Sequence, residues 1–153
     1  MRSTGCGYIS VPGGLPPEEL LSFWGPQLFV DVGFDPSYVI GGGKVPIPGK
    51  QGLPALVDTG AGESCIDSLL AAQLNLPIVD KRLVAGAHGA KEVNMHMAQI
   101  HIPSLQFTLY GEFAAVDLRA GGQSFDALIG RTFLRGFKMV YDGTTGSVEI
   151  SQP

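Results

Sequence analysis

The chain of 153 residues is poor in cysteine, in basic residues and in long apolar runs. Its two cysteines, Cys6 and Cys65, are too few for a disulfide framework, and the N-terminal residues lack the pattern of a secretory leader. We therefore expect a reducing, cytoplasmic setting. The ten Lys and Arg residues against 14 Asp and Glu residues give a net charge of −4, so nucleic acid is not an expected partner. No apolar stretch approaches the roughly 18 residues that a spanning helix needs, so we expect no membrane segment.

Glycine and proline, by contrast, are abundant. The 22 glycines and 11 prolines, in a chain that is 44% hydrophobic, favour many short strands joined by tight turns over long helices. A chain of this length can bury a core of its own as one domain. The composition therefore predicts a mostly β fold.

The order of apolar and turn-forming segments predicts an N-terminal extension at 1–26 and a folded domain at 27–153. Pro16 and Pro17 followed by two acidic residues predict the start of a short helix within residues 16–24. The N–H groups that proline lacks would have no partner in the first turn of a helix, and the helix dipole favours carboxylates at that end. Further short helical segments are expected within 66–76 and 132–137. Strands are expected at 27–34, 53–57, 93–102, 107–116 and 125–129, and as a hairpin of 138–141 with 147–150.

The most informative stretch is 55–61, which reads Ala-Leu-Val-Asp-Thr-Gly-Ala. Here an apolar run delivers the carboxylate of Asp58 to a turn that contains glycine. Residues 127–131, Ala-Leu-Ile-Gly-Arg, repeat the pattern without an acid at the equivalent point. Asp-Thr-Gly alone is also an ordinary turn signal, since all three residue types favour turns. The ordered pair of motifs, followed by Val-Tyr-Asp at 140–142, is more specific than the tripeptide.

Together these segments resemble the retropepsin-like aspartic proteases, the single-lobe retroviral type, over about residues 53–150. The resemblance implies an all-β fold, a closed β-barrel-like aspartic-protease lobe with one or two short helices. It also implies a homodimer in which each subunit lends one Asp58, an activated water as nucleophile, a peptide or protein substrate, and neither cofactor nor metal. Asp58 corresponds to the catalytic aspartate, Thr59 to the residue whose hydroxyl bonds across the dimer axis, and Gly60 to the glycine whose N–H approaches the carboxylate.

The hairpin at 84–93 is similar to the flap that covers the site in these proteases. Two glycines at its tip supply flexibility and let the backbone approach a bound peptide, although a plain surface hairpin is the alternative interpretation. The residues expected to bind substrate are Ala61, Gly62, Gly86, Ala87, His88, Gly89 and Ile129.

Two further polar residues flank the second motif. The resemblance implies that Arg131 pairs with an acid shortly after Asp-Thr-Gly, but Gly62 stands at that position and the acid, Glu63, comes one residue later. Asp126 lacks the Thr-Gly neighbours that would orient a catalytic acid, so we interpret it as a strand-end or turn residue.

The three histidines do not form a convincing metal set. His96 and His101 would point to opposite faces of a strand because their spacing is odd, and we expect exposed or flap positions for all three histidines. Cys65 has no convincing histidine partner, so we expect a buried small apolar residue and not a nucleophile.

Two functions from different classes remain open. The first is an aspartic endopeptidase. The second is a catalytically weak or inactive module of the same fold, used for dimerisation or peptide binding, because a fold can host either function. A third interpretation is one lobe of a larger two-domain protease.

Overall fold

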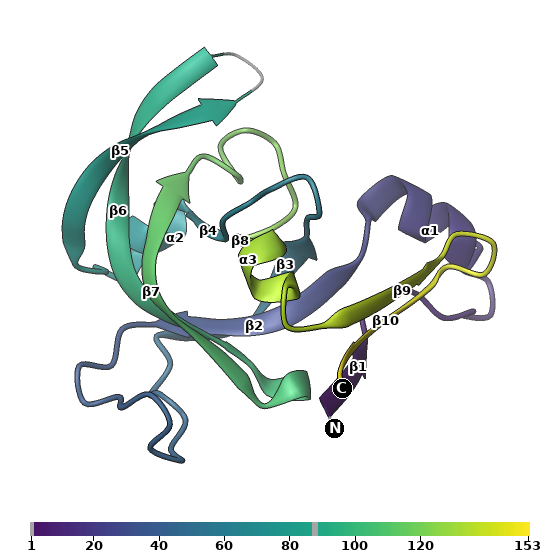
Figure 1. Cartoon of the computed structure of the whole chain (residues 1–153). Coiled ribbons are helices and arrows are strands. Elements are labelled where there is room, and N and C mark those ends of the chain that lie inside the picture. The colour runs from purple at the N-terminus through teal and green to yellow at the C-terminus, as the bar shows by residue number, and fades with distance from the viewer. Residues whose placement is uncertain (1, 87–88) are drawn as a thin grey trace.

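The computed structural model of the chain describes residues 2–86 and 89–153, and strands dominate this part (Figure 1). The strands are β1 Arg2–Gly5, β2 Gln27–Gly33, β3 Lys50–Val57, β4 Cys65–Asp67, β5 Ile78–Gly86, β6 Gly89–Ile102, β7 Phe107–Val116, β8 Ala127–Ile129, β9 Lys138–Asp142 and β10 Ser147–Gln152. The helices are α1 Pro17–Trp24, α2 Ser68–Gln73 and α3 Arg131–Leu134, with a 3-10 turn η1 at Pro103–Leu105. No helix in the described ranges is long and apolar enough to cross a membrane.

Six strands close into a ring, which confirms the expected barrel-like lobe. The strand order is β2-β3-β8-β4-β7-β6, and a further pairing of β2 with β6 joins the two ends. Strand β2 shows why these segments are strands, since Leu28, Val30 and Val32 alternate into the core while Phe29 stays exposed. The helices are short, as expected: α1 lies within residues 1–26, and α2 and α3 lie within the lobe.

Strands β5 and β6 extend beyond the ring as a long hairpin, which we call the flap hairpin (Figure 1). Gly86 pairs with Gly89 at its end, and both are exposed. Gly89 has a φ of +99°, a conformation that glycine adopts without steric cost. Ala87 and His88, expected to contact substrate, lie outside the described residues.

The two ends of the chain meet in a second, three-stranded sheet of order β1-β10-β9. Arg2 pairs with Gln152, and the backbone N–H of Cys6 donates to the carbonyl of Val148 at 2.9 Å. The sequence analysis did not predict β1, because its side chains are mostly exposed and show no alternation. The boundary between residues 26 and 27 stays a prediction, although the first residues pack against the last.

The expectation of exposed or flap positions was wrong for His96 and His101, while His88 lies outside the described residues. His96 and His101 are 5% and 9% exposed, and each ring has a hydrogen-bond partner. The Nδ1 of His96 donates to the carbonyl of Leu76, and the Nδ1 of His101 shares a hydrogen bond with the Thr108 hydroxyl, both at 2.9 Å. These partners satisfy the Nδ1 atom of each ring and make its burial acceptable. Across the described residues, no group of acidic, histidine and cysteine side chains has the arrangement of a metal site.

The burial of His101 predicts a pH-dependent stability. Burial lowers the pKa of His101 from its ordinary 6.5, against an opposing effect of Asp31 on the paired strand β2. The unfolded chain therefore binds a proton here more readily than the folded chain, so this contribution to stability is present above about pH 6.5 and falls as the pH drops toward the lowered pKa. We expect the urea midpoint to fall more between about pH 7.5 and pH 5.5 for the wild type than for His101→Gln. Equal falls would show that another group governs this range.

Candidate active site

The Asp58 turn sits where β3 leaves the ring. Strand β3 runs parallel to β8, with Leu56 beside Leu128 and Val57 beside Ile129. Val57, Ala127 and Ile129 lie in the core, and this anchors the carboxyl end of β3. The backbone N–H of Asp58 donates to the carbonyl of Ile129 at 2.9 Å. The two motifs, far apart in sequence, therefore form one structural unit.

Backbone N–H groups of the turn hold Asp58 in place. The side-chain Oδ1 of Asp58 accepts a hydrogen bond from the N–H of Gly60 at 2.9 Å, and the backbone carbonyl of Asp58 accepts one from the N–H of Ala61 at 3.2 Å. Asp58 is half-buried, whereas Thr59 and Gly60 are exposed. The turn thus presents an oriented carboxylate at the surface, with an exposed hydroxyl next to it.

Backbone hydrogen bonds tie the start of α3 to the same turn. The N–H groups of Arg131 and Thr132 donate to the carbonyls of Ala61 and Gly62 at 2.9 and 3.0 Å. The N–H of Gly130 donates to the Ser64 hydroxyl at 3.0 Å. These bonds fix the loop that follows Asp58 against the second motif.

Arg131 does not pair with an acid. Its Nη1 donates to the backbone carbonyl of Thr59 at 2.7 Å, and among the described residues it forms no ion pair with Glu63 or any other acid. The guanidinium holds the Asp-Thr-Gly backbone directly. Glu63, which stands one residue after the position of the expected acid, therefore does not replace that acid as the partner of Arg131.

Ile129 is fully buried beneath the turn, so its side chain supports the site from inside the core and does not line an open surface. Ala61 is half-buried and Gly62 is exposed beside Asp58, where a bound peptide can reach them. Roles in substrate binding for Ala61, Gly62, Gly86 and Gly89 stay predictions.

Asp126 is engaged by Arg119, whose Nε and Nη2 donate to its two carboxylate oxygens at 3.1 and 2.8 Å. This bidentate pair holds the segment before β8, and Asp126 is 9% exposed. Cys65 is buried as expected. Burial raises the pKa of its thiol to about 12, with the charges of Asp58 and Asp67 adding to the effect, so it is a poor nucleophile.

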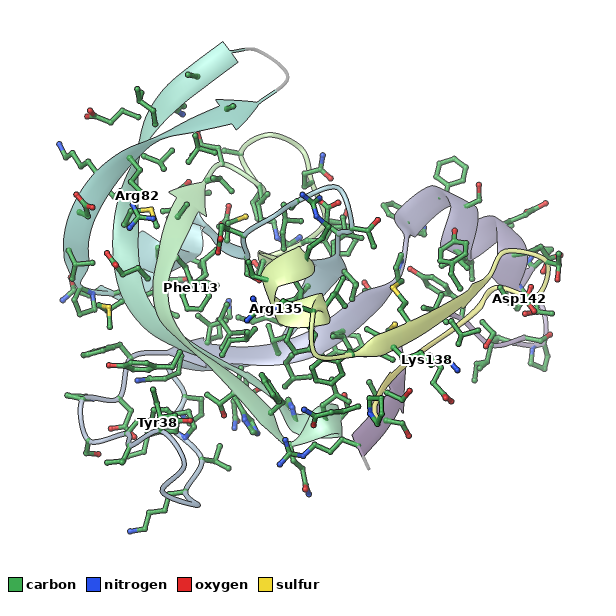
Figure 2. The ribbon with its side chains drawn as sticks, in the orientation of Figure 1. Tyr38, Arg82, Phe113, Arg135, Lys138 and Asp142 are labelled. Carbon is green, nitrogen blue, oxygen red and sulfur yellow. The ribbon has the colours of Figure 1, made fainter. Side chains whose placement is uncertain are left out.

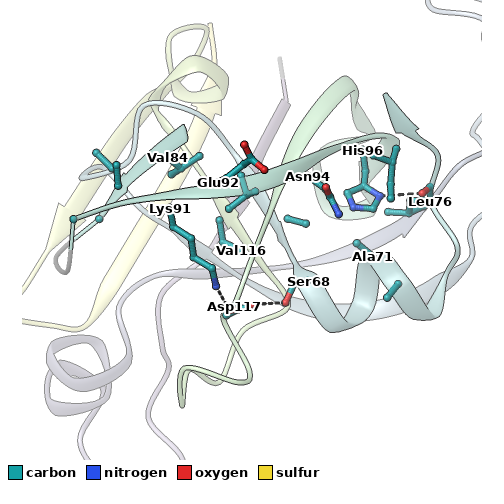
Figure 3. Close-up of a pocket in the computed structure, with 18 of the residues that line it drawn as sticks. Ser68, Ala71, Leu76, Val84, Lys91, Glu92, Asn94, His96, Val116 and Asp117 are labelled. Atoms are coloured by element: carbon teal, nitrogen blue, oxygen red, sulfur yellow. Dashed lines mark hydrogen bonds and ion pairs between the residues drawn. The ribbon is translucent and has the colours of Figure 1, made fainter. Parts of the chain in front are cut away.

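A cavity of about 810 Å³ lies between the flap hairpin, α2 and the end of β7 (Figure 3). Its polar wall contains a chain of side chains from three separate segments. Lys91 on the flap hairpin donates to Asp117 at 2.7 Å, and the Ser68 hydroxyl donates to the other oxygen of the same carboxylate. Hydrogen bonds from Lys91 and Ser68 hold the pKa of Asp117 below its usual value. No spacing in the sequence indicates this contact, because its members come from different strands and helices.

The sequence pattern of the family described as gag-polyprotein putative aspartyl protease matches residues 44–136, which is more than half of the chain. The chain belongs to this family. The matched range contains the Asp58 turn, the flap hairpin and the second motif, and it ends two residues after α3. Membership agrees with the retropepsin-like, strand-rich lobe described above.

Among solved structures, the chain is similar to the EIAV protease complexed with the inhibitor HBY-793, with 17% sequence identity and a TM-score of 0.44. That similarity covers 72% of this chain and 85% of the other. No curated protein matches the chain significantly.

Proposed function

We propose that this protein is an aspartic endopeptidase whose site is completed by two copies of Asp58 in a homodimer. The observation that carries the proposal is the half-buried Asp58 carboxylate, fixed by Gly60 and the β3–β8 pairing, beside an exposed Thr59. Asp126, the other acid near the motifs, is already paired with Arg119. One chain thus offers one half-site, and a second copy of the same turn supplies the other.

The chemistry follows from bringing two carboxylates within a few ångströms of each other. Like charges at that distance do not both ionise readily, so the pair keeps one shared proton over an intermediate pH range. The ionised carboxylate removes a proton from a bound water, and the protonated one polarises the peptide carbonyl. Attack gives a tetrahedral diol without a covalent intermediate, and neither a metal nor a cofactor takes part.

The surrounding residues fit supporting roles in this scheme. The Gly60 N–H orients the carboxylate, and the exposed Thr59 hydroxyl is available to bond across a dimer axis. Gly86 and Gly89 on the flap hairpin let backbone groups approach a bound peptide, and Ala87 and His88 share this proposed role. The cavity of about 810 Å³ beneath that hairpin can receive apolar side chains of the substrate.

The alternative is a catalytically weak or inactive module of this fold that binds peptides or dimerises. The intact Asp58-Thr59-Gly60 turn favours the enzyme, because a module without catalysis has no need for an oriented carboxylate at the surface. The cytoplasmic setting stays a proposal, and both cysteines are free and buried.

A peptide-library digestion across a dilution series tests the proposal. We expect the specific activity to fall on dilution through the dimer dissociation constant, following mass action. Chelators and thiol reagents should leave cleavage unchanged. Full specific activity in a demonstrated monomer would contradict the half-site mechanism. If no peptide is cut at any pH, the binding module becomes the better interpretation.

A further inference from the structure

An aromatic pair lies exposed at the C-terminal end of α1. Phe23 is 83% exposed and Trp24 is 47% exposed, and their ring centroids are 6.2 Å apart. The helix buries Leu21 against the domain, so these two rings are not part of the core. From Leu20 to Val30 the chain contains no charged residue. Charge-poor surface with exposed aromatic rings is typical of the centre of a protein interface.

This aromatic end adjoins the Asp58 turn. The carbonyl of Pro26 accepts a hydrogen bond from the N–H of Val57 at 2.9 Å, and Gln27 pairs with Leu56. Gly25 lies so close to the same strand that a Cβ there would stand 2.9 Å from the Leu56 side chain. The C-terminal end of α1, which leads into β2 (Figure 1), therefore packs against the last residues before Asp58.

A hollow of about 300 Å³ opens beside the pair. It is lined by Tyr8, Leu20, Trp24, Gln27, Ser124 and Phe125. Its walls come from the first residues of the chain, from α1 and from the segment before β8. A projecting ring and a hollow on one face are the features that a self-complementary, two-fold interface requires.

We infer that the surface formed by Phe23, Trp24 and this hollow is where a second copy of the chain docks. The inference rests on the proposed function, which needs a partner's Asp58 next to this chain's Asp58. A two-fold axis that joins the two turns also brings the neighbouring α1 ends to the interface. In the three-stranded sheet, β10 itself cannot pair with the other copy, because β1 and β9 occupy both of its edges. The aromatic surface is an exposed apolar area that adjoins the end of β3 and can hold the two copies together.

Trp24 gives a direct measurement, because it is the single tryptophan of the chain. The experiment uses the Asp58→Asn protein, in which self-cleavage does not interfere, over a wide concentration range. We expect sedimentation velocity to show dimer formation. Over the same concentrations, the Trp24 emission should shift to shorter wavelength and its quenching by acrylamide should decrease. Both changes should follow one dissociation constant.

Phe23→Ser in the same background should raise that dissociation constant by about 30-fold, as expected for an aromatic residue at the centre of an interface. The matched control is Ile40→Ser, which removes another largely exposed apolar side chain, 70% exposed, from the segment between β2 and β3. That segment, marked by Tyr38 in Figure 2, lies on the side of the molecule away from α1, so the control should not change the constant. If Phe23→Ser fails to fold by circular dichroism, Ser22→Arg places a charge on the same exposed surface and should weaken the dimer likewise.

The outcomes separate this inference from the proposed function. A dimer that forms while the Trp24 emission and quenching stay constant, or one that Phe23→Ser and Ser22→Arg leave unchanged, overturns the docking surface but not the two-carboxylate mechanism. A protein that stays monomeric at every concentration overturns the docking surface. If the wild-type monomer also cleaves peptides, the homodimeric mechanism falls as well.

Discussion

Replacement of Asp58 by asparagine is expected to abolish peptide cleavage while the fold stays intact. Asparagine can still accept the hydrogen bond that Gly60 donates to Oδ1 at 2.9 Å, so the turn keeps its conformation. It can neither remove a proton from water nor share one with a second carboxylate. Loss of general acid–base catalysis should lower kcat/KM by about 10²–10⁴-fold or more. The measurement is digestion of the same peptide by both proteins, with circular dichroism spectra to compare their folds.

A mixing experiment gives this prediction its control. Added to the wild type in about tenfold excess, the Asp58→Asn protein should draw most wild-type subunits into mixed dimers with a single carboxylate. By mass action, about one-eleventh of the wild-type activity should remain at protein concentrations where dimers dominate. Activity that is unaffected by the excess would show that each subunit works alone. Unchanged cleavage by the pure variant would remove Asp58 from the mechanism.

Substitution of Gly130 by alanine is expected to cause a large loss of stability. A Cβ at this buried position would lie 2.7 Å from backbone atoms of Glu63 and Gly62, far inside van der Waals contact. Backbone cannot rotate away as a side chain can, so the two segments must separate. The separation also weakens the hydrogen bonds from Gly130 to Ser64 and from Arg131 to Ala61. We expect the free energy of unfolding to fall by about 3 kcal/mol or more.

Gly136→Ala is the matched control, because no atom lies within 4 Å of a Cβ at that position. Its free energy of unfolding should stay within about 0.5 kcal/mol of the wild type. Urea unfolding followed by circular dichroism gives both values. Equal stability of the two variants would mean that the junction between β8 and α3 is looser than its contacts indicate. Because the same junction holds the Asp58 turn, Gly130→Ala should also lose activity under conditions in which it is still folded.

Much of this architecture could be predicted from the sequence, because it follows local rules. The alternation of Leu28, Val30 and Val32 fixed β2, and the paired prolines placed α1 correctly. The Asp58 motif and the second glycine motif together indicated the protease lobe through the resemblance. In each case the signal lies within a few residues of the chain.

The features that were missed depend on contacts between distant segments. Strand β1 is polar and exists because β10 pairs with it. His96 can be buried because the Leu76 carbonyl accepts a hydrogen bond from its ring, and His101 can be buried because the Thr108 hydroxyl lies opposite it. Arg131 reaches the Thr59 carbonyl in place of an acid, and nothing in the spacing of the two motifs indicates that acceptor. Tertiary partners decide such positions, and a single sequence does not name them.

The long separation between the two motifs has a consequence for synthesis of the protein. Thr59 and the guanidinium of Arg131 that holds it are 72 residues apart, a distance that takes about 4 to 14 s to translate at roughly 5–20 residues per second. Until the second motif has left the ribosome, Asp58 lacks the Ile129 carbonyl and the Arg131 contact that fix its turn. The nascent chain therefore carries Asp58, the proposed catalytic residue, before the contacts that hold its turn have formed. Neighbouring proteins, and the growing polypeptide itself, meet the assembled turn only after Arg131 has emerged.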